Sequence, residues 1–263
     1  MSLVNSPTQS ATTCGVLYLV PAPLDFGCAV QAPLIASVPQ GTLQIAATLQ
    51  NWVCENAKST RAYLKRIAEL YPLCVSLQAM QLQELPREVH KKGDHQGGFD
   101  AKHLLQAAMR GFDIGLVSEA GLPAVADPGS SVVRAAHDMG IKVVPLVGPA
   151  SLLLALAASG LNGQSFAFVG YVPVDGMERA KKVKELETLA LKTGQTQILI
   201  ETPYRNTALL QTLLQTLQPS TRLATASGLT MPQSVCRSAL VKLWKSNGWG
   251  LDNASPTVFM LGG

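Results

Sequence analysis

Residues 114–129 have the sequence Ile-Gly-Leu-Val-Ser-Glu-Ala-Gly-Leu-Pro-Ala-Val-Ala-Asp-Pro-Gly, and this stretch decides the fold. The apolar run Ile114–Val117 predicts a short buried strand. The small residues that follow predict a loop. Asp127-Pro128-Gly129 then predicts a helix start, with Asp127 as the N-cap and Pro128 in the first turn. A strand, a loop and a helix in this order are the unit from which α/β proteins are built.

The same unit recurs on both sides of this stretch. Val16–Val20 and Val143–Leu146 are further apolar runs, and each leads into a loop that contains proline. The alternation of strands and helices along the chain predicts an α/β fold with parallel strands. We expect two domains, residues 14–146 and 147–263, because Val147-Gly148-Pro149 has the composition of a hinge.

Composition excludes several classes of protein. The chain has 263 residues, of which 47% are hydrophobic and 14% charged, which excludes a disordered protein. The net charge of +4 is too small by itself to indicate nucleic-acid binding. Val143–Val174 contains no charged residue, but its prolines and glycines divide it into pieces too short to cross a bilayer, so we expect no membrane association.

The cysteines and the familiar sequence motifs exclude further classes. Five widely spaced cysteines without a C-x-x-C pattern predict no metal site. Their odd number, together with the polar residues 1–13, predicts reduced thiols in a cytoplasmic protein. The sequence has no G-x-G-x-x-G, P-loop, G-x-S-x-G or H-E-x-x-H motif, which argues against dehydrogenases, NTPases, serine hydrolases and zincins.

Three loops of small residues follow predicted strands: Pro21–Pro23, Ser118–Pro123 and Val147–Ser151. In open α/β sheets, ligands bind outside the carboxyl ends of the strands. Small residues allow backbone amides to approach a ligand closely, and helix N-termini favour anionic groups. The loops are therefore candidates for a ligand site, and tight turns with helix caps are the alternative.

Taken together, these segments resemble the tetrapyrrole methylases, and most closely their ribose-methylating branch. Ser118–Pro123 and Asp127-Pro128-Gly129 are similar to S-D-A-G-x-P…D-P-G, and Val144–Ser151 is similar to V-P-L-P-G-P-S-A. Further similarities, to L-Y-x-V-P-T-P, F-x-G-F-x-P and E-S-P-H-R, lie at Leu17–Pro23, Phe168–Pro173 and Glu201–Arg205. The resemblance extends in order from about residue 15 to residue 263.

The resemblance implies a two-domain tetrapyrrole methylase fold, with S-adenosyl-L-methionine in the cleft between the domains, and a homodimer. It implies methyl transfer, with a ribose hydroxyl of ribosomal RNA in the small subunit as the expected acceptor. The cofactor contacts that it implies are at Pro23, Ser118, Glu119, Ala120, Gly121, Pro149, Ala150, Ser151 and Gly170.

Departures from the family pattern concentrate on the substrate side. Glu55–Lys58 replaces the acidic element E-D-T-R, and Asp94-His95-Gln96 aligns with E-H-N. Ser227–Met231 replaces R-E-L-T-K, and Leu24-Asp25-Phe26 replaces I-G-N. These departures leave two alternatives open. One is a methyltransferase for a tetrapyrrole or another substrate, and the other is a non-catalytic paralogue that still binds S-adenosyl-L-methionine.

Methylation of a ribose hydroxyl benefits from a general base. His95, in the loop predicted for residues 86–98, and Glu55, after a predicted strand, are the candidates. Lys58 and Arg61 are candidates for binding substrate phosphate. The alternatives are an exposed loop histidine, a capping carboxylate and an ordinary basic helix start. Glu201 and Arg205 are expected to pair across one helical turn in a structural role.

Overall fold

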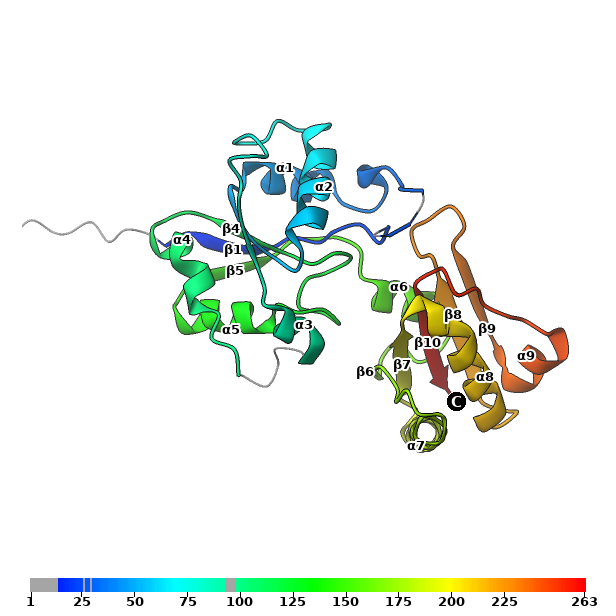
Figure 1. The fold of residues 1–263 in the computed structure, drawn as a ribbon. Helices are drawn as coiled ribbons and strands as arrows, with labels where there is room; N and C mark the ends of the chain where they lie inside the picture. The colour runs from blue at the N-terminus through cyan, green and yellow to red at the C-terminus, as the bar shows by residue number, and fades with distance from the viewer. Residues whose placement is uncertain (1–13, 26, 29, 93–97) are drawn as a thin grey trace, which may run out of the picture. The chain divides into compact units, whose positions relative to one another are not determined.

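The computed structural model describes residues 14–25, 27–28, 30–92 and 98–263, and Figure 1 shows their elements. Contacts divide the chain into two compact units. The first contains the chain up to Ala22 together with Val38–Gly148, and the second contains Pro23–Ser37 and Pro149–Gly263. The division thus falls two residues after the boundary expected from sequence. The second unit also includes residues 23–37, which chain order alone would assign to the first.

A five-stranded parallel sheet forms the centre of the first unit, with strand order β3-β2-β4-β1-β5. The strands are β1 (Val16–Leu19), β2 (Asn51–Cys54), β3 (Gln81–Glu84), β4 (Ile114–Val117) and β5 (Lys142–Pro145). The helices are α1 (Gln40–Thr48), α2 (Ala57–Ala68), α3 (Arg87–Lys92), the short η2 (Lys102–Leu105), α4 (Gln106–Met109) and α5 (Ser130–Asp138). The predicted parallel α/β architecture is confirmed for this unit.

Helices cover both faces of this sheet, with α1 and α2 on one side and α4 and α5 on the other (Figure 1). Ile114 and Leu116 alternate along β4 and pack in the core beneath α5. Trp52 is fully buried on the opposite face, where a Cβ on Gly115 would meet its ring at 2.6 Å. Glycine at position 115 therefore makes room for the indole.

The second unit contains a five-stranded sheet of order β6-β7-β10-β8-β9. Its strands are β6 (Phe166–Gly170), β7 (Thr196–Glu201), β8 (Arg222–Ser227), β9 (Val235–Leu240) and β10 (Thr257–Gly262). Its helices are η1 (Leu34–Ala36), α6 (Ser151–Ser159), α7 (Gly176–Thr193), η3 (Pro203–Arg205), α8 (Asn206–Thr216) and α9 (Val241–Asn247). Among the described residues, no helix is long and apolar enough to cross a membrane.

The prediction of parallel strands is wrong for most of this second sheet. Only β6 and β7 pair in parallel, whereas β7–β10, β10–β8 and β8–β9 are antiparallel. Residues 228–234, which join β8 to β9, contain no helix. A connection that short cannot carry the chain back to start a parallel neighbour. The sheet is therefore mixed, although the unit remains α/β.

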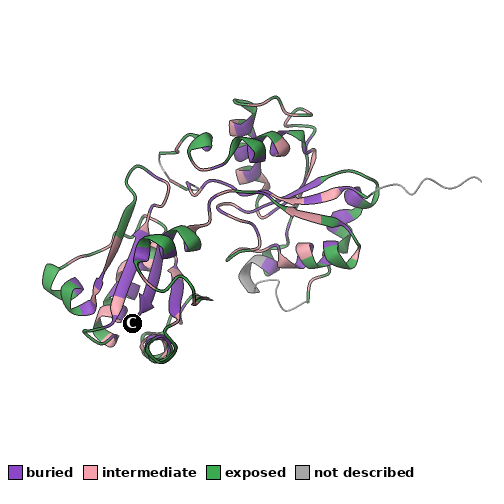
Figure 2. Ribbon diagram, turned by 180° about the vertical axis from the view of Figure 1, so that it is seen from behind, coloured by how far each residue is buried: buried purple, intermediate pink, exposed green. Residues whose placement is uncertain are grey.

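Two apolar clusters cover the two faces of the second sheet. Leu152, Ala155 and Leu156 of α6 pack on one face, against residues such as Met260. The other face is covered by α7, α8 and α9, whose buried side chains surround Phe259. Figure 2 shows the central strands buried and the outer surfaces of the helices exposed. This burial stabilises the unit at roughly 25 cal/mol per Å² of apolar surface removed from water.

Three local expectations are corrected. Within the predicted loop 86–98, residues Arg87–Lys92 form α3, because arginine, glutamate and lysine are good helix formers. Gly129, with φ 134°, is the N-cap of α5, so Asp127 lies before the cap instead of forming it. Gly148-Pro149 has the same proline-containing pattern as a helix start and predicts one there, but α6 begins two residues later, at Ser151, with Ala150 as its N-cap.

Candidate functional site

Loops that follow β1 and β4 are joined at the carboxyl edge of the first sheet. Ala22 and Gly121 form an isolated antiparallel bridge. The Ala22 N–H donates to the Gly121 carbonyl at 2.9 Å, and the Gly121 N–H donates to the Ala22 carbonyl at 3.0 Å. Although β1 and β4 pair in parallel, the loops that follow them meet in antiparallel direction, and the bridge brings two of the predicted loops together.

The loop after β5 reaches the same edge. Gly148 lies so close to Pro21 that a Cβ at position 148 would overlap the proline ring. The Thr42 hydroxyl donates to the Val147 carbonyl at 2.7 Å, and the Tyr63 hydroxyl donates to the Pro21 carbonyl at 2.9 Å. Side chains from α1 and α2 thus anchor two of the loops. The three loops predicted from sequence therefore lie together at this edge. For the third loop this holds up to Gly148, where the first unit ends.

The loop between β4 and α5 has an unusual backbone. Ala124 and Ala126 have φ values of 64° and 65°, a region that residues with a Cβ rarely adopt. Gly121 and Gly129 also have positive φ, at 71° and 134°. Four such residues within nine positions hold the loop in a defined shape. Backbone strain of this kind concentrates at binding and catalytic sites.

Carboxylates gather around this loop. Glu55 directly follows β2, and its Oε2 accepts a hydrogen bond from the Glu119 N–H at 3.2 Å. Burial, and then the negative charges of Glu55 and Glu119, raise the pKa of Asp127 to about 7. Sequence reasoning treated Asp127 only as a helix cap. Its position in the D-P-G segment gave no sign that two other carboxylates would lie near it.

Lys58 and Arg61 lie one turn apart in the first half of α2, and both are exposed. The Asn56 side chain caps this helix by accepting from the Lys58 and Ser59 N–H groups at 2.9 and 3.2 Å. A carboxylate supplements the cap, because Glu84 Oε1 accepts from the Ala57 N–H at 2.6 Å. The two basic side chains therefore extend from a well-anchored helix start next to Glu55.

The remaining predicted site residues fall elsewhere. Pro23, Pro149, Ala150, Ser151 and Gly170 belong to the second unit. Within it, Ala150 and Ser151 form the start of α6, and Gly170 ends β6 at a register irregularity with φ 72°. His95, predicted as a general base, lies outside the described residues.

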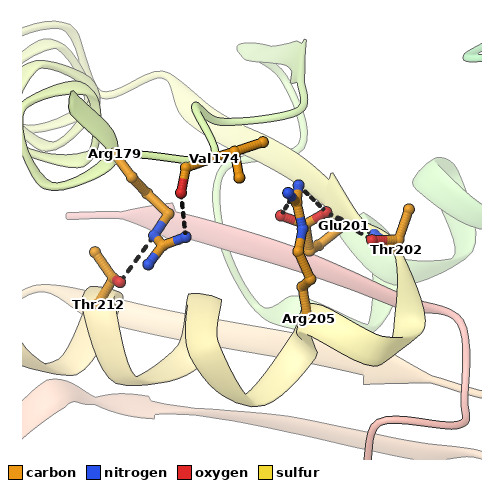
Figure 3. Close-up of polar contacts among 6 residues, drawn as sticks. All are labelled: Val174, Arg179, Glu201, Thr202, Arg205 and Thr212. Atoms are coloured by element: carbon orange, nitrogen blue, oxygen red, sulfur yellow. Dashed lines mark hydrogen bonds and ion pairs between the residues drawn. The ribbon is translucent and has the colours of Figure 1, made fainter. Parts of the chain in front are cut away.

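Glu201 and Arg205 pair as expected (Figure 3). Arg205 Nη2 contacts both carboxylate oxygens of Glu201, at 2.7 and 2.8 Å. Glu201 also accepts from the Thr202 N–H and hydroxyl. Its carboxylate is only 1% exposed, so this motif ties the end of β7 to η3 and α8.

Chemically, the edge of the first sheet offers a strained backbone, small side chains and several carboxylates. Within the described part of the chain, no three His, Cys, Asp or Glu side chains are placed to hold a metal ion. The arrangement does fit a ligand with hydroxyl, amino or sulfonium groups. Small residues let such a ligand approach the backbone, and carboxylates accept its hydrogen bonds and balance a positive charge.

A comparison with protein families matches residues 46–243 to the model described as Tetrapyrrole (Corrin/Porphyrin) Methylases. The ribosomal RNA small subunit methyltransferase I of Vibrio cholerae is 30% identical over 215 residues, covering 82% of this chain and 65% of that protein. The protein of the same name from Bacillus subtilis is 32% identical over 191 residues, covering 73% and 56%. The chain thus spans less than two thirds of the length of either relative.

Solved structures support the same architecture. The uroporphyrin-III-C-methyltransferase of Thermus thermophilus superimposes with a TM-score of 0.51 at 20% identity, covering 94% of each chain. The methyltransferase CobJ superimposes with a TM-score of 0.53 at 18% identity, again covering 94% of each chain. At these identities the likeness establishes the fold alone.

Proposed function

Because this chain belongs to the tetrapyrrole methylase family, we propose that it is an S-adenosyl-L-methionine-dependent methyltransferase acting on RNA of the small ribosomal subunit. The family supports the methyl transfer, and the names of the relatives from Vibrio cholerae and Bacillus subtilis support the RNA acceptor. The proposal includes a homodimer in the cytoplasm, where ribosomal RNA is found.

One structural observation carries the proposal. Three loops meet at one edge of the first sheet. They are held together by the backbone bridge between Ala22 and Gly121 and by the close contact between Pro21 and Gly148. That edge is where open α/β sheets bind ligands. The loops that form this edge are thus the segments that match the family motifs in the sequence.

Ser118, Glu119, Ala120 and Gly121 would hold the cofactor on the first unit. The Glu119 carboxylate would accept hydrogen bonds from a ribose hydroxyl or an amine, while Ala120 and Gly121 allow close backbone approach. S-adenosyl-L-methionine, when bound, supplies an activated methyl group. The contributions of Pro23, Pro149, Ala150, Ser151 and Gly170 to the same cofactor site remain a prediction from the sequence.

The chain's own task is to position the acceptor, exclude water and take up a proton. Glu55 and Asp127 are the described candidates for the proton acceptor. Burial and the neighbouring carboxylates raise the pKa of Asp127 to about 7, which suits a proton acceptor near neutral pH. Lys58 and Arg61, exposed on the neighbouring helix α2, would contact phosphates of the acceptor strand.

The test uses the purified protein with a labelled methyl donor and isolated small ribosomal subunits. Calorimetry with S-adenosylhomocysteine measures cofactor binding separately. Labelled RNA in which the methyl group maps to a ribose oxygen supports the whole proposal. Cofactor binding without RNA labelling would instead indicate another acceptor or a non-catalytic paralogue. Absence of both signals would reject the methyltransferase itself.

A further inference from the structure

The second unit carries an unusual distribution of charge. Between Glu201 and Asp252 the sequence contains no aspartate or glutamate. The same interval contains five basic residues: Arg205, Arg222, Arg237, Lys242 and Lys245. Arg205 is neutralised by Glu201, so four positive charges remain without a carboxylate nearby in the sequence.

Three of these charges lie together in the fold. Arg237 is in β9, and Lys242 and Lys245 are in α9, which follows β9 directly. Arg222, in β8, faces the other side of the sheet, because it pairs with Leu240 and donates to Ser238, whereas Arg237 pairs with Thr225. Since β9 ends the strand order, β9 and α9 form one edge of the sheet (Figure 1). We call Arg237, Lys242 and Lys245 the basic edge. In the described part of the chain, none of them forms an ion pair with a carboxylate.

Helix α9 presents its lysines to solvent. Val241 and Trp244 are fully buried and fix the helix against the sheet, while Lys242 and Lys245 are exposed. The two lysines are three residues apart, so they lie on neighbouring turns with an axial separation of about 4.5 Å. Like charges at this spacing on a helix surface repel each other, and a bound polyanion would relieve that repulsion.

Arg237 is held in place by aromatic rings. Its guanidinium carbon lies 4.8 Å from the ring centroid of Trp249 and 5.7 Å from that of Trp244. Trp244 is itself fixed, because its Nε1 donates to the Leu223 carbonyl at 2.9 Å. Stacking on a ring uses the face of the guanidinium and leaves its N–H edge for an external acceptor.

We propose that the basic edge binds the phosphate backbone of RNA. Arginine forks and lysines are the side chains that contact nucleic-acid phosphates, and these have no competing carboxylate. Helix α7 offers the contrast, because its Lys182 and Lys184 pair with Glu185 and Glu187 at 3.9 and 2.6 Å. The identity of the polyanion as RNA rests on the proposed function, whereas the location rests on the charge distribution.

The experiment compares two double variants of the full chain. Lys242→Gln/Lys245→Gln removes two charges from the basic edge, and Lys181→Gln/Lys192→Gln removes two exposed charges from α7 as a matched control. Fluorescence anisotropy with a labelled single-stranded RNA, repeated between about 50 and 200 mM salt, gives the salt dependence of binding. Each lost phosphate contact lowers the slope of log K against log salt by about 0.7.

We expect the slope to fall by about 1.4 for the α9 variant and to stay at the wild-type value for the α7 control. Equal losses in both variants, or an unchanged slope for the α9 variant, would overturn the location. Binding of poly-L-glutamate as tight as that of RNA would overturn the choice of partner and indicate an acidic protein. S-adenosylhomocysteine calorimetry on the same samples reports the proposed function independently, because none of the four lysines is among the residues proposed to contact the cofactor.

Discussion

Gly148 packs directly on the ring of Pro21, and the space between them holds no side chain larger than the hydrogen of glycine. This contact joins the loop after β5 to the loop after β1 at the edge where the cofactor is proposed to bind. Neither residue carries a functional group. Their importance is geometric, because they fix how far apart the two loops lie.

Gly148→Ala should therefore weaken cofactor binding while leaving the chain folded. The added methyl group must push the rigid proline ring away, which costs roughly 1–3 kcal/mol of stability. Denaturant unfolding and calorimetry with S-adenosylhomocysteine measure the two effects. Gly41→Ala is the control, because a Cβ there meets nothing within 4 Å, and a helical Gly→Ala change stabilises by about 1 kcal/mol. Unchanged affinity in Gly148→Ala would show that loop spacing is irrelevant to binding.

Asp127 should make stability fall as the pH rises through neutrality. Its pKa of about 7 in the folded chain lies above the ordinary aspartate pKa of 3.8, so between these two pH values the folded state holds a proton that the unfolded state has released. This contribution is fully present below about pH 4 and is lost as the pH rises through 7, on the order of 2–4 kcal/mol. Comparing urea unfolding of wild type and Asp127→Asn at pH 5 and pH 8 isolates it. The variant should gain stability relative to wild type at pH 8, and a constant difference between the two proteins would contradict the prediction.

Removing Arg205 should destabilise the second unit strongly. Arg205→Ala leaves the buried Glu201 carboxylate without its cation, which costs roughly 3–5 kcal/mol. Lys184→Ala is a useful comparison. Glu187 is also fully buried, and like Glu201 it keeps two hydrogen bonds without its cation, here from the Gln218 N–H and the Thr221 hydroxyl, both at 2.6 Å. The side chain of Lys184 is 50% exposed and that of Arg205 only 20%, so water screens the Lys184 pair more strongly. Thermal unfolding should show the larger loss for Arg205→Ala, and similar losses in the two variants would contradict the prediction.

Methyl transfer should survive a chelator. Within the described residues no cluster of ligands is placed to hold a metal ion, and the sequence has no zinc-binding spacing. Activity measured with a labelled donor should be the same with and without EDTA. Loss of activity that zinc or magnesium restores would show that a metal takes part.

The sequence by itself determined the local elements and the order in which they occur. Ile114–Val117 is a strand with the predicted bounds, because an apolar run between turn residues depends on little beyond its neighbours in the chain. The motif spacing also identified the family and the three loops. The pairing of Glu201 with Arg205 was predictable for the same reason, since both residues lie within one turn of chain.

Only the tertiary structure decided what happens between residues distant in the chain. The bridge between Ala22 and Gly121 joins positions 99 residues apart by backbone atoms, which leave no signature in the side-chain pattern. The high pKa of Asp127 likewise depends first on its burial in the folded chain, and then on the charges of Glu55, which follows β2, and of Glu119 in its own loop. The mixed direction of the second sheet follows from how its strands pair. The periodicity of apolar residues indicates which face of a strand is buried, but it carries no information about which strand lies next to it. Strand pairing, contacts between loops and the charges that surround a carboxylate are therefore determined only when the chain is folded.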